Sequence, residues 1–198
     1  HKRTDYWHKD FSDAAAYEKS VLPNRQRLAQ MIGIEDAVVA DTKMEYISTT
    51  SMPAKVAENE HFTAYAVRWK LFGNVYGEGL LLKPKQRVKA RIVAIPDADQ
   101  TPETLIGTAP GLSSKLQYAR RLAENGCEVI IPTILDRSDS GSGSARLHLY
   151  TNQPQREWIY RQAYTFGRHI IGYEVQKILA AVDWFSQQNR KSNVPVGV

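Results

Sequence analysis

Three stretches of the chain are rich in β-branched and aromatic residues, as is typical of β-strands: Tyr46–Thr50, His61–Trp69 and Val75–Leu82. The last two are separated by Gly73-Asn74, a pair that suits the tight turn of a β-hairpin. The pattern therefore predicts an antiparallel meander.

Two shorter apolar runs, Arg91–Pro96 and Cys127–Pro132, lack polar alternation. Such runs fit central strands that are covered on both faces. Between them, Ser113–Glu124 has the composition of a helix, which Gly126 should stop. The three segments predict a right-handed β-α-β unit with parallel strands.

Both ends of the chain have helical patterns. At the front, Thr4–Ile32 predicts two helices that are separated by Pro23, with Gly33 as a C-cap. Towards the end, a helical region should run from Pro154 to Gln188, with a bend or break where Gly167 and Gly172 bracket the chain. Its apolar residues recur at helical spacing and predict a core-facing stripe: Ile171, Val175, Ile178, Val182 and Phe185.

A last apolar segment, Val194–Val198, predicts one more buried strand. Together the elements predict an α/β protein with a mixed sheet, antiparallel at its start and then parallel, flanked by helices. A doubly wound nucleotide-binding domain would need a glycine-rich turn after its first parallel strand, and Pro96–Glu103 contains no glycine. We expect a helical extension over residues 1–43 and an α/β domain over residues 44–198.

Composition narrows the function classes. With 198 residues, 42% hydrophobic and 24% charged, the chain suits one domain, and no apolar run reaches the length of a membrane span. The net charge is +5, and one alternating cluster is basic: Lys83, Lys85, Arg87, Lys89 and Arg91. Because no aromatic side chains interleave with it, we interpret the cluster as a solvated connection and expect neither nucleic acid nor membrane as a partner.

The sequence also predicts no cofactor and no metal. His61 and His148 lack metal-ligand spacing, and Ser138–Ser144 lacks the Lys-Ser/Thr ending of a phosphate loop, so we expect a mobile surface loop there. The single cysteine, Cys127, begins an apolar run and is interpreted as a small buried hydrophobic residue.

Two segments near the end carry a family resemblance: Thr151–Tyr160, and the run from Gly167 to the Ala-Val-Asp-Trp sequence at Ala181–Trp184. They resemble the α/β-hydrolase superfamily, in particular bacterial secreted hydrolases related to acetyl xylan esterases and dienelactone hydrolases. The resemblance covers roughly residues 62–198. It implies a carboxylic ester hydrolase, a secreted or periplasmic location, and a small ester or acylated carbohydrate as substrate.

The resemblance also implies where the catalytic residues belong. In this family the helix ending in Ala-Val-Asp-Trp precedes the strand that leads into the Gly-x-Ser-x-Gly turn of the nucleophile. That motif does not occur in the sequence. The serine, and the acid and histidine that follow it in the family's order, are therefore expected beyond Val198.

One catalytic element should be present, a backbone N–H of the oxyanion hole from the loop after the first parallel strand. Alignment by strand end indicates Ala98, with Asp97 and Asp99 as alternatives. Two interpretations stay open, because the carboxylates of this loop also suit turn and cap hydrogen bonds. Arg137 is expected either to line the substrate cleft or, preferably, to pair with Asp136.

His169 lies out of order for a triad histidine, so we interpret it as a helix-surface or supporting residue. The alternative function is a non-catalytic domain that binds carbohydrate or a protein partner through aromatic residues: Tyr6, Trp7, Tyr150 and Trp158. If the sheet is truncated before the nucleophile turn, Val194–Val198 should form an exposed edge strand that pairs with another chain or is poorly ordered.

Overall fold

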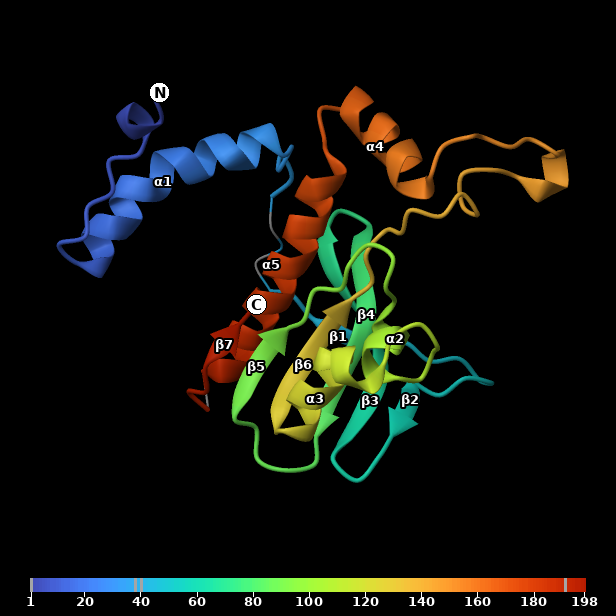
Figure 1. Cartoon of the computed structure of the whole chain (residues 1–198). Helices are drawn as coiled ribbons and strands as arrows, with labels where there is room; N and C mark the ends of the chain where they lie inside the picture. The colour runs from blue at the N-terminus through green and yellow to red at the C-terminus, as the bar shows by residue number, and fades with distance from the viewer. Residues whose placement is uncertain (1, 38, 40, 191) are drawn as a thin grey trace.

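A mixed seven-stranded sheet forms the centre of the protein in the computed structural model, which describes residues 2–37, 39, 41–190 and 192–198 (Figure 1). The strand order is β1-β3-β4-β6-β5-β7, and β2 also pairs with β3. The strands are β1 (Met44–Tyr46), β2 (Lys55–Glu58), β3 (Phe62–Phe72), β4 (Val75–Pro84), β5 (Ala90–Val93), β6 (Cys127–Pro132) and β7 (Val196–Gly197). The predicted α/β class with a mixed sheet is confirmed.

The antiparallel half is built on the long hairpin of β3 and β4, which turns at Gly73-Asn74 as predicted. Gly73 has a φ of +46°, a backbone conformation that glycine adopts at little cost. The strand β2 was not predicted, because three of the four side chains of Lys55–Glu58 are exposed and give no apolar pattern.

The parallel half contains the predicted β-α-β unit. β5 and β6 pair in parallel, and α3 (Tyr118–Glu124) connects them. The predicted helix over Ser113–Glu124 is interrupted at Gln117, whose side chain turns inward and donates a hydrogen bond to the carbonyl of Leu112. Only a 3-10 turn, η2 (Ser114–Leu116), precedes it. A short helix, α2 (Pro102–Ile106), was not predicted.

Three longer helices complete the chain: α1 (Ala14–Met31), α4 (Gln155–Thr165) and α5 (Ile170–Asn189), with short 3-10 turns η1 (Arg3–Tyr6) and η3 (Ala145–Leu147). The predicted separation at Pro23 is wrong, since α1 runs through it. Pro23 and Lys19 are both exposed, so water can solvate the Lys19 carbonyl, which would otherwise accept the missing N–H. The predicted break before α5 is confirmed at Gly167, whereas Gly172 lies within α5.

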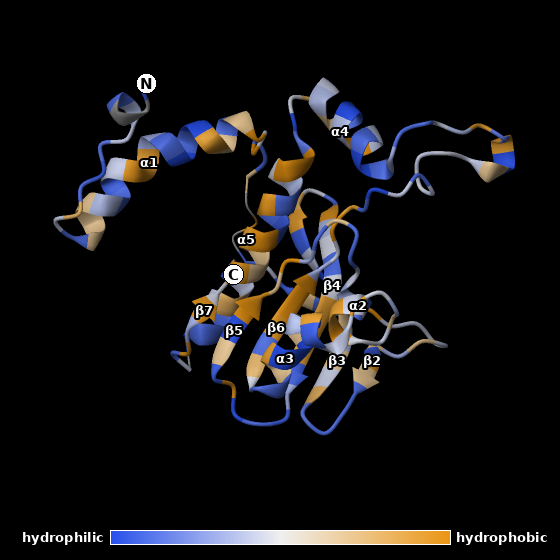
Figure 2. Ribbon diagram, viewed as in Figure 1, coloured by the Kyte–Doolittle hydropathy of each residue, from blue (hydrophilic) through white to orange (hydrophobic). Residues whose placement is uncertain are grey.

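The core consists of two clusters, one on each face of the sheet (Figure 2). Successive residues of β4 and β6 alternate between them, as the period of a strand requires. On one face, Leu80, Leu82 and Ile131 pack with α2 and α3; on the other, Leu81 and Ile130 pack with α5.

The predicted stripe on α5 is correct at its far end only. Phe185 is fully buried, and Ile178 and Val182 pack against its cluster, but the side chain of Ile171 is 38% exposed. Nearer the start of α5, the buried face carries Glu174 and Gln176, whose polar side chains hid it from a search for apolar periodicity.

Two further expectations about single residues are settled. Arg91 does not belong to the exposed basic cluster, because its side chain is buried against Glu128. Cys127 is half-buried and packs against the core cluster on the face of the sheet covered by α2 and α3. Burial raises the pKa of its thiol, as expected for a packing residue.

The N-terminal segment projects from the sheet (Figure 1). In α1 only Val21 is buried. Asp36 binds the N-terminal segment to the chain just before α5, since its carboxylate accepts two hydrogen bonds of 2.8 and 2.9 Å from Arg168. Among the described helices, none is both long and apolar enough to cross a bilayer.

Candidate functional site

Two loops leave the carboxyl ends of β5 and β6, the edge at which parallel sheets bind ligands. In the loop after β5, the N–H of Asp97 donates a hydrogen bond to Gln100 Oε1, and the N–H of Asp99 donates one to Asp97 Oδ1. Both donor–acceptor distances are 3.3 Å. The backbone N–H of Gln100 donates a hydrogen bond of 3.0 Å to the Asp97 carbonyl. These bonds close the loop into a compact turn, which Thr101 continues by capping α2.

Arg137, in the loop after β6, joins the two loops. Its Nη1 lies 3.0 Å from Asp97 Oδ1 and 2.6 Å from Asp99 Oδ2. The expected pair with Asp136 is wrong, because Asp136 instead accepts hydrogen bonds from the backbone N–H and hydroxyl of Ser138. The contacts were not visible in the sequence because the partners are about 40 residues apart.

The ion pairs shift the protonation of this loop. The Arg137 guanidinium, followed by the N–H of Asp99, lowers the pKa of Asp97, and the N–H of Ala98 contributes the smallest lowering. The two carboxylates in turn raise the pKa of Arg137. Asp97 is therefore anionic at neutral pH, and Arg137 balances part of its charge.

Ala98 is 8% exposed, whereas its neighbours Asp97 and Asp99 are exposed. The N–H groups of these two neighbours already have partners within the loop. The N–H of Ala98 lies near enough to the Asp97 carboxylate to affect its pKa, but it forms no hydrogen bond of good geometry with the described residues. Of the three candidate donors, Ala98 is the one that this structure leaves most available.

A cavity of about 340 Å³ lies beside these loops, between α4 and α5. Its wall combines charged, aromatic and apolar side chains: Arg137, Pro154, Arg156, Glu157, Tyr160, His169, Ile170 and Ile171. Arg137 thus belongs both to the cavity wall and to the pairs with Asp97 and Asp99. The sequence predicted a place in a cleft wall as one of two alternatives for Arg137, and it did not predict the pairs with Asp97 and Asp99.

His169 and Tyr160 form one side of this cavity. His169 is the N-cap of α5, and its Nδ1 accepts the N–H of Ile171 over 3.0 Å. The Tyr160 ring meets the imidazole edge to face at 4.8 Å. The expectation of a helix-surface or supporting role for His169 is consistent with this cap, and Tyr160 was not anticipated.

Arg156, which is part of the cavity wall, and Glu174 hold α4 on α5. Arg156 makes two hydrogen bonds to the Glu174 carboxylate, of 2.5 and 2.6 Å, and a third of 3.0 Å to the carbonyl of Leu135. Glu174 is 8% exposed. Neither residue was singled out from the sequence, where an Arg and a Glu 18 positions apart on separate helices carry no signal.

The described residues do not assemble a serine–histidine pair, since none of their hydrogen bonds joins a serine hydroxyl to an imidazole. Ser142, in the loop expected to be a mobile surface segment, is instead buried, and its hydroxyl donates to the Gln153 carbonyl over 2.6 Å. Nor do three His, Cys, Asp or Glu side chains of the described chain gather as metal ligands would.

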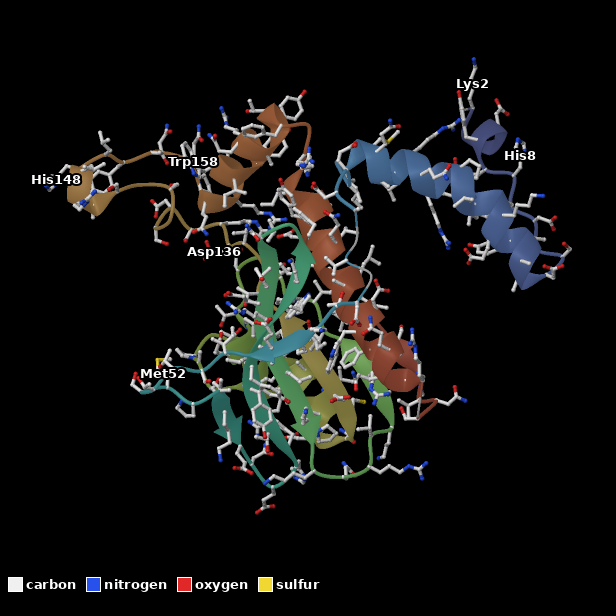
Figure 3. The ribbon with its side chains drawn as sticks, turned by 180° about the vertical axis from the view of Figure 1, so that it is seen from behind. Lys2, His8, Met52, Asp136, His148 and Trp158 are labelled. Carbon is white, nitrogen blue, oxygen red and sulfur yellow. The ribbon has the colours of Figure 1, made fainter. Side chains whose placement is uncertain are left out.

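The aromatic residues of the alternative function are all exposed but are not brought together. Tyr6 and Trp7 precede α1, with Tyr6 in η1, whereas Trp158 belongs to α4 and Tyr150 to the loop that protrudes before α4 (Figure 1). Figure 3 shows Trp158 on α4, with His148 farther out on the loop and Asp136 near its base. These four aromatic residues therefore form no common binding platform.

Comparison with known proteins identifies the fold. No protein-family model matches the sequence, and the curated proteins give no significant match. Among solved structures, the chain is similar to a candidate acetyl xylan esterase from Bacteroides fragilis, with a TM-score of 0.60 and 17% identity over 95% of this chain and 49% of that one. It also matches a glucuronoyl esterase from Solibacter usitatus, with a TM-score of 0.45 and 13% identity over 90% of this chain and 53% of that one.

The sheet is thus that of an α/β-hydrolase-like fold, as the resemblance in the sequence implied. The chain spans about half the length of each of these two structures.

Proposed function

We propose that this chain forms part of a carboxylic ester hydrolase, similar to acetyl xylan esterases, that acts by acyl transfer through a serine. The observation that carries the proposal is the position of β7. It runs parallel to β5, with Val196 opposite Arg91 and Gly197 opposite Ile92. The carboxyl end of β7 therefore points towards the edge of the sheet where the loop containing Asp97–Asp99 lies.

This juxtaposition matches the requirements of the reaction. In α/β-hydrolases the nucleophile follows a strand at this place, and the neighbouring loop supplies an oxyanion-hole N–H. We assign that donor to Ala98, with Asp97 and Asp99 as the alternatives. A preorganised donor of this kind lowers the barrier by about 3 kcal/mol.

Arg137 keeps the flanking carboxylates paired, which reduces the repulsion that they would exert on a developing oxyanion. As part of the cavity wall, it is also our candidate for a substrate contact. The substrate class is a small ester or an acylated carbohydrate, which would place its acyl group at the loop and the rest towards the cavity.

The serine, the histidine and the acid are not assigned to any of the 198 residues. We propose that polypeptide seated beside β7 supplies all three. The likeness to a structure of which this chain covers 49% supports the idea that the complete catalytic centre needs more chain than this.

The test compares the 198-residue chain with the full product of its encoding gene, using p-nitrophenyl acetate and a fluorophosphonate label. We expect the chain alone to show neither turnover nor label, and the full product to show both, with the label on a serine outside these residues. A labelled serine within the chain would overturn the assignment of the nucleophile. A full product without turnover would overturn the esterase proposal.

A further inference from the structure

A second cavity, of about 220 Å³, contains a lysine that the proposed ester hydrolysis does not use. Lys177 of α5 lines it together with residues of β4, α4 and the loop after β6: Tyr76, Glu78, Thr133, Ile134, Leu135, Asp136 and Gln155. The Nζ of Lys177 donates one hydrogen bond, of 2.7 Å, to the carbonyl of Thr133. An amino group has further positions that can face the cavity.

The stem of Lys177 is held firmly. Trp69 Nε1 donates to the backbone carbonyl of Lys177 over 3.0 Å. Gly77 lies against the side chain, since a Cβ at Gly77 would come within 2.8 Å of Lys177 Cγ. The backbone and the Cγ of Lys177 are therefore packed in place, and the hydrogen bond to Thr133 holds the amino group at the cavity wall.

The charges around this amino group come from four elements. Glu174 lies on α5 itself, Glu78 on β4, Arg156 on α4 and Asp136 in the loop after β6. Within the described chain no carboxylate reaches salt-bridge distance of Nζ. Burial lowers the pKa of Lys177 and Arg156 adds to this, although Glu174 and Glu78 act in the opposite direction.

We propose that Lys177 is a covalent capture site for small aldehydes. Its neutral amine adds to the carbonyl carbon, a proton passes to the carbonyl oxygen, and loss of water from the carbinolamine gives an imine. Glu78 and Asp136 line the same cavity and can relay the proton that the departing hydroxyl requires. Partly desolvated lysines are the side chains that enzymes use for such bonds.

The size and charge of the cavity select the ligand class. A volume of about 220 Å³ is below that of sites for drug-sized ligands and suits a carbonyl compound of a few heavy atoms. The carboxylates of Glu78 and Asp136 would repel an anionic aldehyde. A short, neutral aliphatic aldehyde therefore fits best, and the inference does not depend on the proposed ester hydrolysis.

The experiment treats the purified chain at neutral pH with propionaldehyde and sodium cyanoborohydride, which reduces an imine to a stable secondary amine. Peptide mass spectrometry then compares the modification rates of Lys177 and of Lys115, an exposed lysine of η2. We expect Lys177 to react at least about fivefold faster, with its rate rising at lower pH than that of Lys115.

Lys177→Arg should abolish this fast modification while keeping a donor for the Thr133 carbonyl, and Lys115→Arg should leave it unchanged. The comparison within the unaltered chain does not require either variant to fold. Equal or slower reaction at Lys177 than at Lys115 would overturn the proposal, as would fast modification that persists at another site in Lys177→Arg.

Discussion

At the scale of single residues, the guanidinium of Arg91 joins the strands to the connection between α5 and β7. Its Nε lies 3.0 Å from Glu128 Oε2, and its Nη1 donates to Asn189 Oδ1 over 2.6 Å and to Ser192 Oγ over 2.8 Å. Arg91 and Glu128 are also direct neighbours in the parallel register of β5 and β6. Alternation along the sequence could place Arg91 on a face, but not show that this face is buried.

Arg91→Ala should lower the free energy of unfolding by about 3 kcal/mol, because it leaves the buried Glu128 carboxylate without its partner. Urea denaturation provides the measurement. Arg25→Ala, which breaks the exposed pair with Glu18, should change stability by less than about 0.5 kcal/mol. An Arg91→Ala protein as stable as this control would contradict the role of the pair.

Arg137→Gln should raise the pKa of Asp97, since hydrogen bonding to Arg137 is the largest cause of its lowering. A depressed carboxyl pKa stabilises the fold above the unfolded-state pKa, and this contribution disappears as pH falls through the folded-state value. The variant should therefore lose less stability on acidification than the parent. NMR titration of the Asp97 carboxyl measures the shift, and an unchanged pKa would mean that the contact does not form in solution.

At the scale of elements, α1 docks on the start of α5 through two glycines. Gly33, which ends α1 with a φ of +67°, leaves no room for a Cβ, which would lie 2.6 Å from the N of His169. A Cβ on Gly172 would lie 2.2 Å from the carbonyl oxygen of Ile32. The backbone of the N-terminal segment thus approaches the helix that carries His169 and the cavity wall.

Gly172→Ala should destabilise this docking by about 1–3 kcal/mol, because the atom it meets belongs to the backbone. The loss should exceed the gain of roughly 1 kcal/mol in helix propensity. Limited proteolysis of the first 37 residues and thermal melting measure the effect. Gly197→Ala is the matched control, since nothing lies within 4 Å of its Cβ position. Equal behaviour of the two variants would refute close docking.

Most elements followed from local patterns, and the exceptions have local causes. Hydrophobic runs predicted β3 to β6 because both faces of the central sheet are covered. Pro23 wrongly predicted a break in α1. It lies on an exposed part of the helix, where water can replace the hydrogen bond that proline cannot donate. The helix α2 does have a local signal in the sequence, namely Thr101 as a cap followed by Pro102 in the first turn.

At the scale of the whole molecule, the candidate site depends on the order of strands rather than on any motif. The order β4-β6-β5-β7 brings the loops after β5 and β6 together at one edge of the sheet. The sequence indicated Asp97, Ala98, Asp99 and Arg137 from strand ends alone. It could not show which acids Arg137 pairs with, because contacts across 38 to 40 residues depend on the closed sheet.

The same order leaves β7 at an edge, and from this we predict self-association. β7 pairs with β5 on one side, and within the described residues no strand lies on its other side. Such an edge, with Val198 71% exposed beside it, favours pairing with another chain. Sedimentation should therefore show a dimer forming as the concentration of the 198-residue chain rises.

Val198→Lys should shift this equilibrium to the monomer, because a charged residue at an open edge opposes strand addition. Leu179→Lys is the control, since it removes an exposed apolar side chain of α5 that belongs to no strand. If association persists in Val198→Lys but is lost in Leu179→Lys, the contact involves α5 instead. A chain that stays monomeric at every concentration would contradict the prediction that the β7 edge recruits a second copy.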